Sequence, residues 1–249
     1  MESTMIYVKL FHLVPLMKAV IMCLGSFAST LLSYLLGYVS IYVPFISETG
    51  AFGVPKSFFT FSVICGGCVL GPLLFLERYL AVRTLINVEN EVLQKINLIA
   101  MYFGFMSTVG LAGVIAFPVS SIFWTHMLSA VAHFFFAMFY VLLQTYLTFC
   151  STQVTEFMKK VRYYLCGLII IFCFMLVVLL PVSFSVWNRE NTHLPAVKKP
   201  GDKGFGLMVT TACVEWTMYG FYLLYLITFY SEFLRCKFFV GMTPKEDEE

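Results

Sequence analysis

Six long apolar stretches, separated by short polar segments, constrain this sequence more than any other feature. A helix needs about 20 mostly apolar residues to cross the hydrocarbon core of a bilayer, which is about 30 Å thick. The stretches that meet this requirement are residues 12–36, 57–79, 96–118, 126–149, 163–186 and 207–231. The alternating strands typical of a membrane β-barrel do not occur in the sequence. The pattern predicts an all-α, polytopic membrane protein built as a six-transmembrane helical bundle.

The composition excludes several other classes of protein. Hydrophobic residues make up 60% of the 249 residues and charged residues only 12%. A soluble domain has about 25% charged residues, which it needs to cover its surface. The formal net charge of +2 provides no basic field for a phosphate backbone. A soluble enzyme, a disordered scaffold and a nucleic-acid binder are therefore excluded, and membrane lipids are the expected surroundings.

The placement of Lys and Arg predicts the orientation. If the N-terminus, the second and fourth connections and the C-terminus share one side, that side holds eleven of the sixteen Lys and Arg residues. The positive-inside rule then places both termini in the cytoplasm. Residues 1–249 form a single transmembrane domain that ends in a short cytoplasmic tail, 232–249, with an acidic end. Lys18, early in the first span, is expected to extend toward the cytoplasmic headgroups.

The fourth and sixth spans carry polar stripes that are expected to face the interior of the bundle. In the fourth span, six residues recur at alternating four- and three-residue intervals and share one face: His126, Ala130, His133, Ala137, Tyr140 and Gln144. In the sixth span, Thr211, Glu215, Tyr219 and Tyr222 likewise share a face. An ionisable group inside a membrane costs about 2.5–3.5 kcal/mol and tends to face a partner. One hypothesis is that Glu215 and His133, at similar depth, share a hydrogen bond or a proton. The alternative is that each has a separate tyrosine or backbone partner.

Motifs for chemistry are weak. Cys65-Gly66-Gly67-Cys68 has the spacing of redox and zinc sites, but its glycines favour close helix packing instead. No P-loop, zinc-protease, nucleophile-elbow or dinucleotide motif occurs. We therefore expect no metal, no cofactor and no catalytic residue. Cys150 and Cys236, at cytoplasmic helix ends, are candidates for palmitoylation, although ordinary apolar packing is the simpler interpretation.

Several motifs resemble those of one membrane-protein family. The first outer loop reads PFISETG (44–50) and is followed by Pro55, Arg78-Tyr79 closes the second span, and Trp187-Asn188 follows the fifth. His126, Tyr140 and Gln144 mark the fourth span, and CVEWTMYGF (213–221) lies in the sixth. Together these resemble the FRAG/DRAM/Sfk family (CWH-like N-terminal domain) of six-span membrane proteins over nearly the whole chain. Lys56 departs from the pattern, because relatives often have Glu after the proline.

The resemblance implies six helices with cytoplasmic termini and a role in membrane lipid organisation. It implies that the family-defining residues are Ile46, Ser47, Glu48, Thr49, Gly50, His126, Gln144, Glu215 and Trp216. Gly50 suits a turn that requires positive φ, and the loop polar groups can hydrogen-bond the neighbouring backbone. Together with His133, Tyr140 and Tyr219, these residues form either a lipid-headgroup pocket or a structural polar core.

The resemblance, together with the lack of catalytic motifs, implies two classes of function. The first is a non-catalytic, lipid-associated subunit that holds a lipid-kinase or lipid-transfer assembly at a membrane, with a protein partner docking on residues 83–95, 151–162 and 234–249. The alternative is an autophagy modulator of endolysosomal membranes, or a component of GPI-anchor lipid remodelling. A multi-pass location in the plasma membrane or an endomembrane is common to both.

Overall fold

A computed structural model describes residues 4–85 and 90–242. Within these residues, six helical segments are long and apolar enough to cross a membrane, and their bounds are Phe11–Leu35, Gly53–Leu85, Glu91–Ala116, Phe123–Cys150, Glu156–Glu190 and Phe205–Phe233. The six predicted spans and the all-α class are confirmed. Most of the helices extend past the predicted limits, because their polar terminal turns continue beyond the apolar stretch.

The spans contain several elements each. The first joins the 3-10 turn η1 (Phe11–Leu13) to α1 (Val14–Leu35), and the second joins α3 (Gly53–Ser62), the π-helix η2 (Val63–Val69) and α4 (Leu70–Leu85). The third, fourth and fifth are α5 (Glu91–Ala116), α6 (Phe123–Cys150) and α7 (Glu156–Glu190). The sixth is α8 (Phe205–Ile227) with α9 (Tyr230–Phe233). The side chains of Asn90 and Thr155 cap α5 and α7.

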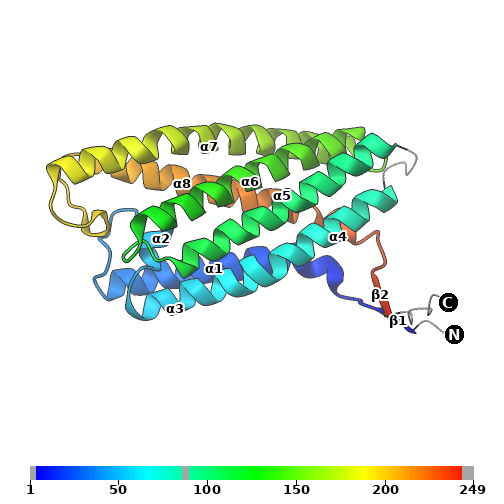
Figure 1. Ribbon diagram of the computed structural model, residues 1–249, viewed down its shortest axis with the longest axis horizontal. Coiled ribbons are helices and arrows are strands. Elements are labelled where there is room, and N and C mark those ends of the chain that lie inside the picture. Colours follow the sequence, from blue (N-terminus) through cyan, green and yellow to red (C-terminus); the bar gives the residue numbers. More distant parts are fainter. Residues whose placement is uncertain (1–3, 86–89, 243–249) are drawn as a thin grey trace, which may run out of the picture.

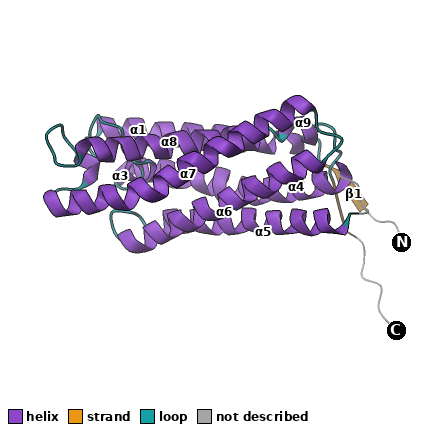
Figure 2. Cartoon of the chain, turned by 90° about the horizontal axis from the view of Figure 1, so that it is seen from above, coloured by secondary structure: helices purple, strands orange, loops and turns teal. Residues whose placement is uncertain are grey.

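The spans lie lengthwise beside one another as an elongated bundle (Figure 1). One end, which we call the loop end, carries α2 (Ile46–Thr49) and the connection that contains the 3-10 turn η3 (Pro195–Val197). The other, which we call the terminal end, carries strands β1 (Thr4–Tyr7) and β2 (Phe239–Met242). Figure 2 shows the same division from above. That β1 and β2 share one end agrees with an even number of crossings.

Close backbone approach determines the packing of α5 against α6, the most extensive helix pair. A Cβ atom added at Gly110 of α5 would lie 2.5 Å from the backbone nitrogen of His133 on α6. In the second span, Gly66 packs against Met22 and Gly67 against Leu111. Small residues therefore allow the helices to approach, as membrane helix packing requires. Gly66 and Gly67 of the C-x-x-C motif act as packing residues in this way.

The prediction that Lys18 extends toward the cytoplasmic headgroups is wrong. Its side chain is buried, and Nζ donates a hydrogen bond to the carbonyl oxygen of Gly66 at 2.9 Å. The lysine points into the bundle rather than toward headgroups, because a carbonyl of η2 on the neighbouring span provides an acceptor.

The two strands were not expected from the sequence. β1 and β2 pair antiparallel, with Thr4 opposite Met242 and Tyr7 opposite Phe239. The pairing continues past the strands, since the Val8 amide donates to the Phe238 carbonyl at 3.1 Å and the rings of Phe11 and Phe238 stack at 4.0 Å. The N-terminal and C-terminal segments are therefore joined outside the bundle. The acidic end of the tail, and residues 86–89 of the second connection, lie outside the described residues.

Candidate functional site

The short helix α2 in the first loop is stabilised by its own polar side chains. Glu48 Oε2 accepts a hydrogen bond from the Phe45 amide at 3.0 Å, and Thr49 Oγ1 donates to the Ile46 carbonyl at 2.7 Å. The bond to Glu48 is one half of a capping box, the half supplied by a Glu three residues after the N-cap, because the Phe45 side chain has no acceptor for the other half. Gly50 has φ −102°, so the predicted positive φ is wrong. The residue is small for another reason: a Cβ there would overlap the Phe59 ring.

Two serines of α1 attach this loop to the bundle. Ser29 Oγ and Ser33 Oγ both donate to the Thr49 carbonyl oxygen, at 2.8 and 2.6 Å. Both serines are fully buried, and Ser29 Oγ also donates to the Pro55 carbonyl of α3 at 3.2 Å, so α1 contacts both the loop and the start of the second span. Two hydroxyl donors on one carbonyl fix the position of α2 over the bundle.

Glu215 and Trp216 of α8 hold the other side of the loop. Glu215 Oε2 accepts a hydrogen bond from the Ile46 amide at 2.8 Å, and Trp216 Nε1 donates to the Pro44 carbonyl at 2.8 Å. The loop is therefore bound to the sixth span at Pro44 and at Ile46, the first residue of α2. One turn further along α8, Tyr219 Oη lies 3.3 Å from Ser26 Oγ.

A buried ion pair adds a second connection across the loop end. Lys198 Nζ lies 3.4 Å from Glu48 Oε2 and donates to the Pro195 carbonyl at 3.2 Å. Both side chains are almost completely buried. Burial raises the pKa of the Glu48 carboxyl above its usual value, and the Lys198 ammonium and the Phe45 amide offset part of that rise. Sequence reasoning missed Lys198, which reads as one of several loop lysines.

Replacing Lys198 by methionine is expected to make the loop end pH-sensitive. A carboxyl whose pKa rises on folding takes up protons as the protein folds, so stability falls as the pH rises through that range. Without Lys198 the pKa of Glu48 rises further, and we expect a loss of about 1–3 kcal/mol at pH 7 that diminishes on acidification. Hydrogen exchange of the backbone amides of residues 44–51, followed as a function of pH, measures this loss. A Glu48→Gln/Lys198→Met double variant should restore protection at pH 7, and continued loss in it would contradict the explanation.

The two histidines of α6 have separate partners. His126 Nδ1 donates to the Phe117 carbonyl at 2.9 Å, and His133 Nδ1 donates to the Ser107 carbonyl at 2.9 Å. Because a carbonyl only accepts, Nε2 of each neutral ring is an acceptor. The described residues contain no direct hydrogen bond between His133 and Glu215. His133 and Glu215 each have a backbone partner instead, although both side chains line the same small cavity.

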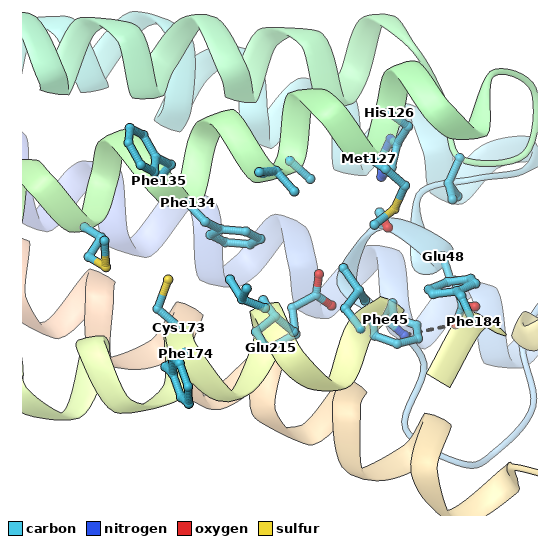
Figure 3. A pocket seen from close by; sticks show the side chains of 18 of the residues that line it. Phe45, Glu48, His126, Met127, Phe134, Phe135, Cys173, Phe174, Phe184 and Glu215 are labelled. Atoms are coloured by element: carbon cyan, nitrogen blue, oxygen red, sulfur yellow. Dashed lines mark hydrogen bonds between the residues drawn. The ribbon is translucent and has the colours of Figure 1, made fainter. Parts of the chain in front are cut away.

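That cavity has a volume of about 70 Å³ and adjoins a larger one of about 290 Å³ between α6 and α7. The residues that line both are Ser47, His126, Ala130, Phe134 and Glu215. Figure 3 shows the Glu215 carboxylate projecting from α8 toward α6, with Phe134 and His126 on α6. We call the two together the loop-end cavity. It combines a polar end at α2 with an apolar body.

The body of the loop-end cavity opens toward the lipid-facing surface. Phe135 of α6 and Phe174 and Val177 of α7 line it, yet these side chains are 49%, 69% and 63% exposed. Large apolar side chains with this exposure on a membrane span face acyl chains. The arrangement can admit an apolar chain from the side and present carboxylate, hydroxyl and imidazole groups to its polar end.

Two of the predicted site residues lie elsewhere. Gln144 Oε1 accepts a hydrogen bond from Arg78 Nε at 2.8 Å, toward the terminal end. Tyr140 is completely buried there, its ring against Phe75, and its hydroxyl has no hydrogen-bond partner among the described residues. The predicted polar residues therefore form two groups, and Tyr140 and Gln144 do not line the loop-end cavity.

Gln144 belongs to a buried cluster that sequence reasoning did not assemble. Glu232 of α9 forms ion pairs with both Arg78 and Arg162, the latter at 2.9 Å. Arg162 also donates to Thr148 Oγ1 and to the Thr228 carbonyl, each at 2.9 Å, and both guanidinium groups lie over the Phe229 ring. We call Arg78, Arg162 and Glu232 the arginine–glutamate cluster. The cluster joins the second, fifth and sixth spans, and its hydrogen bonds to Gln144 and Thr148 attach the fourth.

The predicted modification sites differ in accessibility. Cys150 is exposed at the end of α6, whereas Cys236 is half-buried and its sulfur lies 3.9 Å from Thr84 Oγ1. Palmitoylation of either stays a prediction.

Comparison with known proteins provides the family context. Residues 10–235 match the family described as "Frag1/DRAM/Sfk1/Cwh43P N-terminal domain". The DNA damage-regulated autophagy modulator protein 2 of Rattus norvegicus and that of Mus musculus are each 30% identical over 84% of this chain and 82% of theirs. The modulator protein 1 of Xenopus laevis is 27% identical over 84% of each chain. No solved structure matches.

Proposed function

Because the chain belongs to the Frag1/DRAM/Sfk1/Cwh43 family, we propose that it modulates autophagy as a non-catalytic lipid-binding protein of an endomembrane. The chain is an integral multi-pass membrane protein. The observation that carries the proposal is the match, along most of the chain, to proteins named as autophagy modulators. These names favour the autophagy alternative over the lipid-kinase or lipid-transfer scaffold expected first from the sequence.

The loop-end cavity supports the lipid-binding part of the proposal. Its body is lined by Phe, Met, Val and Leu side chains and reaches the surface between α6 and α7. Its polar end holds Glu215 and Ser47. An acyl chain would occupy the body, and the head of the lipid would hydrogen-bond at the end beneath α2. Binding of this kind changes which lipids surround the bundle without any bond being broken.

Two neighbouring valines of α7 provide the test. Val177 lines the cavity, whereas Val178 does not line it, and both are exposed apolar residues on the same helix. We expect Val177→Trp to fill the opening and to reduce several-fold the lipid that co-purifies in mild detergent, with Val178→Trp unchanged. In cells that lack the protein, Val178→Trp should restore autophagic flux and Val177→Trp should not.

Different failures of this test contradict different parts of the proposal. Equal lipid content in the two variants would overturn the cavity as the binding site. Unchanged autophagic flux in cells without the protein would overturn the autophagy role. If Glu215→Gln abolished turnover of a lipid while protein abundance and bound lipid stayed normal, a catalytic role in lipid remodelling would replace the non-catalytic one.

A further inference from the structure

A separate cavity lies at the terminal end of the bundle. It has a volume of about 200 Å³. It lies between α4, the segment that follows β1 and the segment that follows α9. We call it the terminal cavity. Its lining includes Lys9, His12, Glu77, Thr84 and Lys237. None of these residues lines the loop-end cavity or belongs to the arginine–glutamate cluster, so the proposed function leaves the terminal cavity unexplained.

The described N-terminal and C-terminal segments form the roof of the terminal cavity. The β1–β2 pair, the hydrogen bond from the Val8 amide to the Phe238 carbonyl and the stacked rings of Phe11 and Phe238 hold the segments together. Thr84 Oγ1 lies 3.9 Å from Cys236 Sγ, which connects this roof to α4. The cavity is therefore enclosed by defined contacts and is not a gap between unrelated loops.

Glu77 of α4 lies at the base of the terminal cavity. Its side chain lines the cavity, the residue is only 5% exposed, and Oε2 has no hydrogen-bond partner among the described residues. A buried carboxylate oxygen normally has a donor, because leaving it without one costs free energy. Its neighbour Arg78 pairs with Glu232 instead. Glu77 Oε2 therefore lacks the hydrogen-bond donor that a buried carboxylate oxygen normally has, and a positively charged donor would also balance its charge.

The charged side chains at the mouth of the terminal cavity are positive, opposite in sign to the Glu77 carboxylate at its base. Lys9 and Lys237 line the terminal cavity and are exposed, one on each terminal segment. In the structure neither forms an ion pair with Glu77. A complementary ligand has a cationic group that reaches the base and an anionic group that stays near the lysines. A primary ammonium separated from a phosphodiester by a short linker has this arrangement.

The surroundings point to the lipid headgroup layer as the source of this ligand. The terminal strands expose Met5, Ile6 and Val240 by 67%, 63% and 52%. Large apolar side chains beside lysines, at the end of a transmembrane bundle, are typical of segments that rest in the membrane interface. The terminal cavity then opens at the depth where headgroups lie.

We propose that the terminal cavity binds the headgroup of an aminophospholipid, with its primary ammonium donating to Glu77 and its phosphodiester beside Lys9 and Lys237. The acceptor without a donor favours a primary ammonium over the quaternary ammonium of choline, which has no N–H group. This site does not depend on the proposed function, because it involves the opposite end of the bundle and its test measures lipid selectivity rather than autophagy.

The test compares two lipids with the same acyl chains. Full-length protein in mild detergent is titrated with phosphatidylethanolamine or phosphatidylcholine, and bound lipid is measured by native mass spectrometry. We expect the wild type to prefer phosphatidylethanolamine by about tenfold, the value of a charged hydrogen bond. Glu77→Gln should abolish the preference. Glu190→Gln, which changes an exposed carboxylate at the loop end, should retain it.

Stability measurements separate ligand binding from a structural role. Glu77 Oε2 has no hydrogen-bond partner among the described residues, so Glu77→Gln should leave the thermal midpoint of the lipid-free protein unchanged or higher, and a lower midpoint would contradict the proposal. Equal binding of the two lipids, or a preference that survives Glu77→Gln, would overturn the proposal.

A competition experiment tests whether the headgroup alone is recognised. Competition by soluble glycerophosphoethanolamine would support recognition through the headgroup alone, whereas competition by glycerophosphocholine to the same extent would overturn the requirement for N–H donors.

Discussion

Replacing Glu232 by glutamine is expected to remove about 3–5 kcal/mol from the free energy of unfolding, which exceeds half the stability of many domains. Glu232 is 2% exposed and is the only carboxylate that pairs with Arg78 and Arg162 in the described structure. The glutamine would leave two buried guanidinium groups without a counter-charge. Such groups are costly because neither water nor an anion compensates them.

A matched control distinguishes this effect from a general loss of charge. Glu156 pairs with Lys159 at 2.8 Å, but its side chain is 78% exposed. Exposed pairs contribute about 0–1 kcal/mol. Glu156→Gln should therefore accumulate normally and keep its thermal midpoint in detergent, while Glu232→Gln accumulates poorly and melts earlier. If the two variants melt together, the arginine–glutamate cluster does not stabilise the terminal end.

Gly110→Ala is expected to destabilise the bundle by about 1–3 kcal/mol, the usual range for overpacking. The added Cβ would lie 2.5 Å from the backbone nitrogen and 2.9 Å from the Cα of His133. Backbone atoms cannot move aside as a side chain can, so α5 and α6 would have to separate. Unfolding or thermal inactivation in the same detergent measures the loss.

Gly167→Ala provides the control for helix propensity. Gly167 lies in α7 and has nothing within 4 Å of an added Cβ. Both substitutions improve intrinsic helix propensity by up to about 1 kcal/mol, so only the contact with α6 distinguishes them. We expect Gly167→Ala to be neutral or stabilising. A Gly110→Ala variant as stable as Gly167→Ala would contradict the close approach of α5 and α6.

Hydropathy predicts the spans because the bilayer requires each crossing to be long and apolar. Of the six residues in the stripe predicted on the fourth span, His126, Ala137, Tyr140 and Gln144 are buried, and Ala130 and His133 are half-buried. The stripe could not show how these residues divide along the axis. Tyr140 and Gln144 lie beside the arginine–glutamate cluster, whereas His126 lies at the loop end. This division depends on the tilt of the helix and on which helices are its neighbours.

Other features depend on contacts between segments that are distant in sequence. Arg78, Arg162 and Glu232 each lie near the end of a span, where a charge is typical of an interfacial residue, and only packing brings them together. Lys18 points inward because of a carbonyl on another span. The strands β1 and β2 are four residues each, which is too short for a period-two pattern to identify them.

The order of synthesis has a consequence for the terminal sheet. Strand β1 leaves the ribosome before the first span, and β2 only after the sixth, so the two cannot pair until every crossing has been translated. The roof over Glu77 therefore cannot close before the sixth crossing has been synthesised. A nascent or prematurely terminated chain could insert its early helices normally and would still lack this closure, which makes the sheet a structural marker of completed biogenesis.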